Sequence, residues 1–222
     1  MSKRNASGFA CAAVAAAAVS ATASAGTTGF QVFNDINSFL VENPFMLQDD
    51  VGGMTLDNQP RQHSSLEFDH MTISTGNDVA LSVWDEAFGD AFATQGDQFI
   101  HVAANGMSVT FNFAAPVVRF GLHITDWGEW GDGSLWYSDD ANNHHTIATT
   151  SMANGNVMFF GMQSDVGISQ IILERDNLLP GGVQHDGFGM DNFHYEFAMV
   201  PAPGALAFLG AAGLLGTRRR RH

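Results

Sequence analysis

The chain has 222 residues and a net charge of −14, with 23 acidic residues against nine lysines and arginines. Six of these nine lie near the two ends, so residues 26–200 hold three arginines and all 23 acidic residues, a net charge of −20. Nucleic-acid binding needs lysines and arginines that neutralise phosphates, so this composition argues against a nucleic-acid partner. Cys11 is the one cysteine, which excludes disulfides and cysteine-ligated metals from the rest of the chain.

The N-terminal residues 1–25 have the order of a secretory signal peptide. Lys3 and Arg4 precede an apolar run from Phe9 to Val19, and small residues follow at Ala23 and Ala25. This order predicts export and cleavage after Ala25. The apolar run is shorter than the ~20 residues that a membrane span needs. A buried alanine-rich helix is the alternative interpretation.

Residues 26–199 predict one all-β domain. A strand over 30–33 comes first, and Asn34 or Asp35 is placed to cap a short helix over 35–41 that Pro44 would stop. Short runs of alternating or apolar character follow, separated by turn residues. These runs cover residues 65–73, 79–83, 98–102, 107–113, 117–125, 134–137, 146–149, 157–162, 168–174 and 190–197. Short strands at this spacing predict an antiparallel two-sheet β-sandwich of the jelly-roll kind.

Residues 200–222 form a tail with three parts: a proline motif, a small and apolar segment, and a basic cluster. The residues that define the first and last parts are Val200, Pro201, Pro203, Arg218, Arg219, Arg220 and Arg221. Arginines are retained on the cytoplasmic side of a membrane, so they would hold the apolar segment there during export. A terminal amphipathic helix that packs on the domain is the alternative.

This tail resembles the PEP-CTERM sorting signal of Gram-negative and related bacteria. The resemblance implies an exosortase-type processing enzyme as partner, transient insertion in the inner membrane, and delivery to the cell surface or the extracellular matrix. Ala202 stands where that signal usually has an acidic residue. The body is similar to β-sandwich domains that precede such tails, over residues 111–117, 120–126 and 186–193, and this likeness implies a fold without implying an activity.

An acidic, glycine-containing segment over residues 126–133 is a candidate calcium site. Asp126, Glu129 and Asp132 offer carboxylate oxygens, and Asp191 is a fourth candidate ligand. Calcium prefers oxygen ligands, and glycines allow backbone carbonyls to turn towards the ion. The alternatives are a solvated acidic loop and, for Asp191, a turn residue that bonds its own backbone.

Four aromatic residues lie close to this acidic segment: Trp127, Trp130, Trp136 and Tyr137. Exposed aromatic rings beside polar groups are one way to present a platform for sugars. Amphipathic rings also pack half-buried at the rim of a sandwich, which is the alternative.

The sequence carries no recognisable catalytic motif. Its histidines form no His-Glu-x-x-His pair, and no G-x-S-x-G elbow occurs. The carboxylates of residues 126–132 could supply a glycosidase pair, although the clustered acidic motif of concanavalin-like hydrolases is absent. We therefore predict a non-catalytic exported surface or matrix protein that binds extracellular polysaccharide. The alternatives are a structural or adhesive protein without a defined ligand and, thirdly, a glycoside hydrolase.

Overall fold

The computed structural model describes residues 29–41, 46–49, 51–57, 59–76, 79–103, 108–127, 134–148, 155–175 and 187–199. These residues form one short helix, α1 (Ile36–Val41), and an antiparallel sheet of 11 strands. The strands are β1 (Phe30–Phe33), β2 (Leu47–Asp49), β3 (Ser65–Glu67), β4 (Met71–Ser74), β5 (Leu81–Trp84), β6 (Phe99–Val102), β7 (Ser108–Thr125), β8 (Leu135–Asp139), β9 (His144–Ala148), β10 (Val157–Arg175) and β11 (Phe188–Phe197). The predicted all-β antiparallel sandwich is confirmed.

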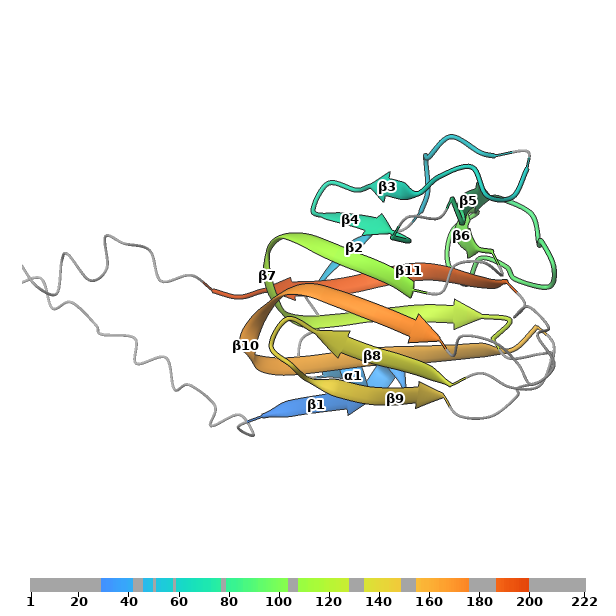
Figure 1. Ribbon diagram of the computed structural model, residues 1–222. Coiled ribbons are helices and arrows are strands. Elements are labelled where there is room, and N and C mark those ends of the chain that lie inside the picture. The colour runs from blue at the N-terminus through green and yellow to red at the C-terminus, as the bar shows by residue number, and fades with distance from the viewer. Residues whose placement is uncertain are drawn as a thin grey trace, which may run out of the picture.

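The sheet folds into two layers because its two longest strands, β7 and β10, run through both (Figure 1). In layer A the order is β3-β4-β7-β10-β8-β9, formed by residues 108–113 of β7 and 170–175 of β10. In layer B the order is β1-β10-β7-β11-β6-β5, formed by the other halves of β7 and β10, and β2 also pairs with β11.

The bends of β7 and β10 lie against each other. A Cβ on Gly167 of β10 would lie 2.8 Å from the Cβ of Pro116 in β7, so only glycine fits at this contact. The register of the two strands shifts between Gln163 and Ile168, which allows the turn from one layer to the other. At each bend the sequence predicted two separate strands, one before the bend and one after it. The structure corrects this, because β7 and β10 each continue as one strand through the bend.

A second correction concerns residues 65–73, which were predicted as one strand. They form the hairpin β3–β4, in which the backbone N–H of Phe68 donates to the carbonyl of Met71 at 2.8 Å. The alternation in this run was genuine, since Leu66, Met71 and Ile73 are all buried, but the turn at residues 68–70 divides it.

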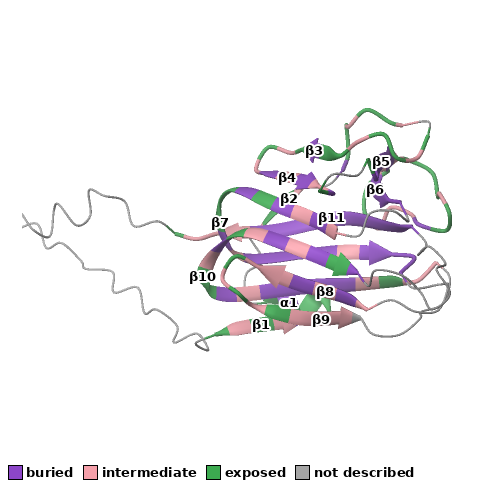
Figure 2. Cartoon of the chain, in the orientation of Figure 1, coloured by how far each residue is buried: buried purple, intermediate pink, exposed green. Residues whose placement is uncertain are grey.

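The core lies between the layers and is rich in aromatic rings (Figure 2). Its largest fully buried side chains include Tyr137, Phe111, Phe120, Phe160 and Phe193. The tyrosine comes from layer A and Phe120 from layer B, so the two layers bury their inner faces against each other. Apolar burial of this kind stabilises a domain that has no disulfide.

Helix α1 forms within the range that the sequence predicted, and it covers part of the outer face of layer B. The carboxylate of Asp35 caps it by accepting hydrogen bonds from the backbone N–H and the hydroxyl of Ser38, at 2.8 and 2.9 Å. Phe39 is fully buried, and Gly121 and Gly161 lie beneath its ring. A Cβ on Gly161 would lie 2.9 Å from the Phe39 ring, so the bare backbone at these two positions lets the helix approach the sheet.

Candidate functional site

The start of the predicted calcium segment belongs to the folded core. Asp126 is fully buried, and its Oδ1 accepts a hydrogen bond from the backbone N–H of Gly155 at 2.8 Å. Trp127 is 3% exposed, and its ring meets Phe188 edge-on at 5.2 Å. These contacts tie the end of β7 to the residues just before β10 and to the start of β11.

The other residues of that segment, Glu129, Trp130 and Asp132, lie outside the described residues. The calcium site at residues 126–132 therefore stays a prediction. Within the part of the chain that the structure describes, no group of three or more histidines and carboxylates is placed to hold a metal ion.

Asp191 anchors the segment that joins β5 to β6. Its Oδ2 accepts hydrogen bonds from the backbone N–H of Thr94 at 2.7 Å, the Thr94 hydroxyl at 3.0 Å and the backbone N–H of Gln95 at 2.8 Å. Its Oδ1 accepts the backbone N–H of Asn192 at 2.6 Å. Four donors therefore bind this carboxylate, three at Oδ2 and one at Oδ1. Asp191 is fully buried and holds this segment, and its role as a calcium ligand stays a prediction.

A row of polar side chains lies beside Asp191 on the outer face of layer B. Nδ2 of Asn192 lies 3.0 Å from Nδ1 of His123, and its Oδ1 accepts a hydrogen bond from Gln48 at 2.8 Å. His194 is 5% exposed, and its Nε2 has no hydrogen-bond partner among the described residues. Burial, and then the neighbouring His123, lower the pKa of His194 from 6.5 to about 4. The imidazole is therefore neutral at physiological pH.

Trp136 and Tyr137 point to opposite sides of β8, because successive strand residues alternate between faces. Tyr137 is fully buried and donates its hydroxyl hydrogen to Asp139 at 2.5 Å. Burial, and then this hydrogen bond, raise the pKa of the phenol. Since Tyr137 and Trp127 both lie in the core, a sugar cannot reach them. Of the four predicted platform rings, only that of Trp136 is described on the outer face of layer A.

The outer face of layer A is a polar face, defined here by the outward side chains of its strands. Each is exposed or half-buried, whereas the residues between them are mostly buried (Figure 2). They are Ser65, Glu67, Thr72, Ser74, Ser108, Thr110, Asn112, Trp136, Ser138, His144, Thr146, Gln170, Ile172 and Glu174. Helix α1 lies against the opposite layer and leaves this face uncovered.

Strand pairing places specific neighbours around Trp136. Glu174 is its partner on β10 and Thr146 its partner on β9, while Ser138 follows two residues later on the same face. The ring of His144 lies 6.4 Å from that of Trp136, with 36° between their planes. A planar ring beside hydroxyl, imidazole and carboxylate groups can contact the C–H face of a sugar while its neighbours bond the hydroxyls.

Sequence reasoning found Trp136 but missed His144, Thr146 and Glu174. The signal was present in part, because Glu174 is the last residue of a predicted strand and follows the apolar Leu173. The sequence alone does not show that β9 and β10 pair with the two edges of β8.

The fold and this face define an antiparallel all-β sandwich with a polar sheet surface that the described helix does not cover. No protein-family model matches the chain, and no curated protein matches its sequence. Similar solved structures include a cleaved adhesin domain of Lys-gingipain, with 10% identity and a TM-score of 0.43, over 70% of this chain and 99% of that chain. TmCBM61 in complex with β-1,4-galactotriose is 17% identical with a TM-score of 0.35, over 64% of this chain and 97% of that chain.

The catalytic domain of a GH87 α-1,3-glucanase in complex with nigerose is also similar, with 11% identity and a TM-score of 0.30. The match covers 79% of this chain and 29% of the glucanase chain.

Proposed function

We propose that this is an exported, non-catalytic surface or matrix protein whose polar face on layer A binds extracellular polysaccharide. The observation that carries the proposal is the position of Trp136. Its ring lies half-buried on an uncovered sheet face, beside the exposed His144 and the exposed carboxylate of Glu174. Binding sites for hydroxylated ligands combine a few apolar or aromatic rings with precisely placed polar groups, and this face supplies both.

The charge of the domain favours a neutral polysaccharide. Arg119 and Arg175 are each 5% exposed, so Arg61 is the one exposed arginine among the described residues. A surface dominated by carboxylates repels polymers that carry carboxylates or sulfates. Neutral sugars avoid this repulsion and still find acceptors for their hydroxyl hydrogens.

Truncating Trp136 should weaken polysaccharide binding without unfolding the domain. We expect Trp136→Ala to raise the Kd for a glycan identified on a glycan array at least about tenfold, equivalent to ~1.4 kcal/mol, because an aromatic anchor is removed. Isothermal titration calorimetry measures this change. Trp84→Ala is the matched control, since Trp84 is also half-buried but lies on β5 and stacks on Phe88 at 4.2 Å.

Two results would contradict the proposal. If the wild-type protein bound no glycan on the array, the structural or adhesive alternative would replace polysaccharide binding. If the bound glycans released new reducing ends during incubation, the protein would be a hydrolase.

The export part of the proposal rests on the two ends of the sequence. The signal-peptide order of residues 1–25 and the three-part tail of residues 200–222 lie outside the described residues. No helix in the described part of the chain is both long enough and apolar enough to cross a membrane. We infer that an exosortase-type enzyme processes the tail while it is inserted in the inner membrane.

Neutralising the basic cluster tests this inference. Replacing Arg218 to Arg221 with glutamine should leave unprocessed precursor or mislocalised protein, because the charges that retain the apolar segment are lost. Cell fractionation with immunoblotting measures both products. Arg61→Gln is the control, since this exposed arginine lies within the domain. An unchanged fractionation pattern would contradict a sorting role for the tail.

A further inference from the structure

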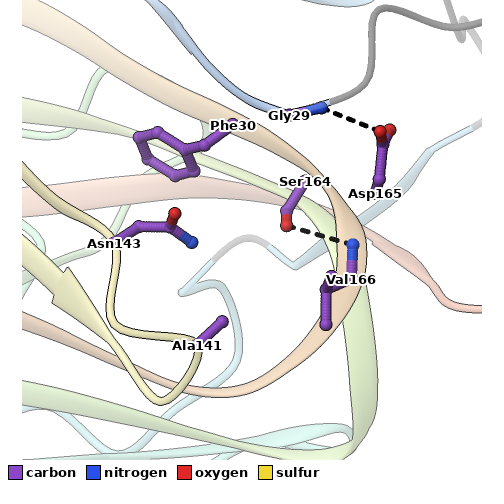
Figure 3. A pocket seen from close by; sticks show the side chains of 7 residues that line it. All are labelled: Gly29, Phe30, Ala141, Asn143, Ser164, Asp165 and Val166. Atoms are coloured by element: carbon purple, nitrogen blue, oxygen red, sulfur yellow. Dashed lines mark hydrogen bonds between the residues drawn. The ribbon is translucent and has the colours of Figure 1, made fainter.

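A cavity of about 420 Å³ lies at the side of the sandwich, where Phe30 and Ala141 pack against the core. Figure 3 shows the side chains that line it. Three segments that are far apart in the sequence surround it: residues 29–30 at the start of β1, residues 141–143 in the turn between β8 and β9, and residues 164–166 in the bend of β10. Its volume is within the range of roughly 300–1,000 Å³ that is usual for small-molecule pockets.

Hydrogen bonds to the backbone hold the polar groups of this cavity in place. Oδ2 of Asp165 accepts the N–H of Gly29 at 2.8 Å, which ties the start of β1 to the bend of β10. The hydroxyl oxygen of Ser164 accepts the N–H of Val166 at 3.2 Å (Figure 3). Asn143 donates from its backbone N–H and its side-chain amide to the two carboxylate oxygens of Asp139, at 2.9 and 2.8 Å. These contacts preorganise the site.

Each of these polar groups keeps bonding capacity for a ligand. Oδ1 of Asp165 and the amide oxygen of Asn143 accept no hydrogen bond from the described residues, and the Ser164 hydroxyl still has its hydrogen to donate. Two acceptors and one donor therefore line the cavity. Among the described residues that line it there is no arginine or lysine to pair with an anionic ligand, so we consider a neutral ligand.

The remaining wall is apolar. The ring of Phe30 is half-buried and is supported from behind by Tyr137, whose ring centre lies 5.2 Å away. The side chain of Val166 is 61% exposed at the rim. An apolar ring opposite hydroxyl-bonding groups matches a pyranose, which has C–H groups on its faces and hydroxyls around its edge.

We propose that this cavity binds one neutral sugar ring at a chain end or a branch, an inference that rests on the proposed polysaccharide binding. The polar face on layer A spans several strands and suits the middle of a chain. The cavity, by contrast, is bounded by three short segments, and its volume suits a single ring beside Phe30 and Ser164. The protein then has two sugar-binding sites: the polar face binds the middle of a polysaccharide chain, and the cavity binds its end or a branch.

The test uses the full domain and two sets of probes. Methyl glycosides of glucose, galactose, mannose and N-acetylglucosamine report on the cavity, and a polymer selected on the glycan array reports on the polar face. Saturation-transfer NMR identifies the glycoside that binds, and calorimetry gives its Kd. We expect Phe30→Ala and Asp165→Asn each to raise the glycoside Kd at least about tenfold, while Trp136→Ala leaves it unchanged.

Asp140→Asn is the matched control, because Asp140 is an exposed carboxylate that bonds the N–H of Ser169 outside the cavity. Asp165→Asn keeps the proposal testable if Phe30→Ala does not fold, since the asparagine can still accept the N–H of Gly29. If no methyl glycoside bound, or if both cavity variants bound it as the wild type does, the cavity proposal would be overturned. If Trp136→Ala lost polymer binding while neither cavity variant changed glycoside binding, the polar face would be the one sugar site supported.

Discussion

Replacing Asp191 with alanine is expected to lower the free energy of unfolding by roughly 3–5 kcal/mol, since each buried donor left without a partner costs about 1–3 kcal/mol. The carboxylate is fully buried and accepts from Thr94, Gln95 and Asn192. Alanine would leave their backbone N–H groups unpaired inside the protein. The segment between β5 and β6 would also lose its attachment to the outer face of layer B.

Urea denaturation followed by tryptophan fluorescence measures this loss. Asp97→Ala is the control, because Asp97 is an exposed carboxylate on the same segment and its removal should change stability by less than about 0.5 kcal/mol. Hydrogen exchange adds a local readout, since the amides of Thr94 and Gln95 should lose protection in Asp191→Ala. Equal unfolding midpoints for Asp191→Ala and the wild type would show that Asp191 does not hold the segment.

Acidification from pH 7.5 to pH 5 should destabilise the folded domain through His194. Its pKa in the folded protein is about 4, below the 6.5 of the unfolded chain, because burial and the nearby His123 disfavour the charged imidazole. The unfolded chain therefore takes up a proton first as the pH falls. The neutral imidazole contributes its full stabilisation above pH 6.5, and this contribution is lost progressively between pH 6.5 and pH 4. From pH 7.5 to pH 5 the free energy of unfolding should fall by roughly 1–2 kcal/mol.

The surroundings of His194 support this direction. His123, on the neighbouring strand, also has a lowered pKa through burial, which the charge of Asp191 partly opposes. Asn192 and Gln48 are neutral, and the ion pair of Arg119 with Glu196, 3.8 Å apart, carries no net charge. No carboxylate is hydrogen-bonded to His194, so nothing described offsets the cost of charging it.

Urea denaturation at several pH values and constant ionic strength tests the prediction. His194→Gln should have a shallower dependence of unfolding free energy on pH than the wild type. His144→Gln is the control, because His144 is exposed and its removal should leave that slope unchanged. If the slope of His194→Gln equalled that of the wild type, the acid sensitivity would come from other groups.

Local residue patterns determined much of this protein. Alternation and turn residues predicted an all-β sandwich, and Asp35 predicted the one short helix, because capping and strand faces depend on residues close in sequence. The acidic composition, without any lysine after residue 25, already argued against a nucleic-acid partner. Trp136 and Tyr137 are adjacent in sequence and were predicted to lie on one sugar-binding platform. Side chains alternate along β8, so the two rings lie on opposite faces of the sheet.

The tertiary structure decided the features that depend on distant pairings. Pro116 lay between two predicted strands, yet Gly167, in another strand, packs against it, and β7 continues through the bend. Asp191 was a candidate metal ligand in the sequence, and the structure adds hydrogen bonds to it from Thr94 and Gln95, almost a hundred residues away. The cavity, likewise, exists only because residues 29–30, 141–143 and 164–166 meet at one side of the sandwich. Such contacts depend on strand order and register, which the periodicity of a single sequence does not encode.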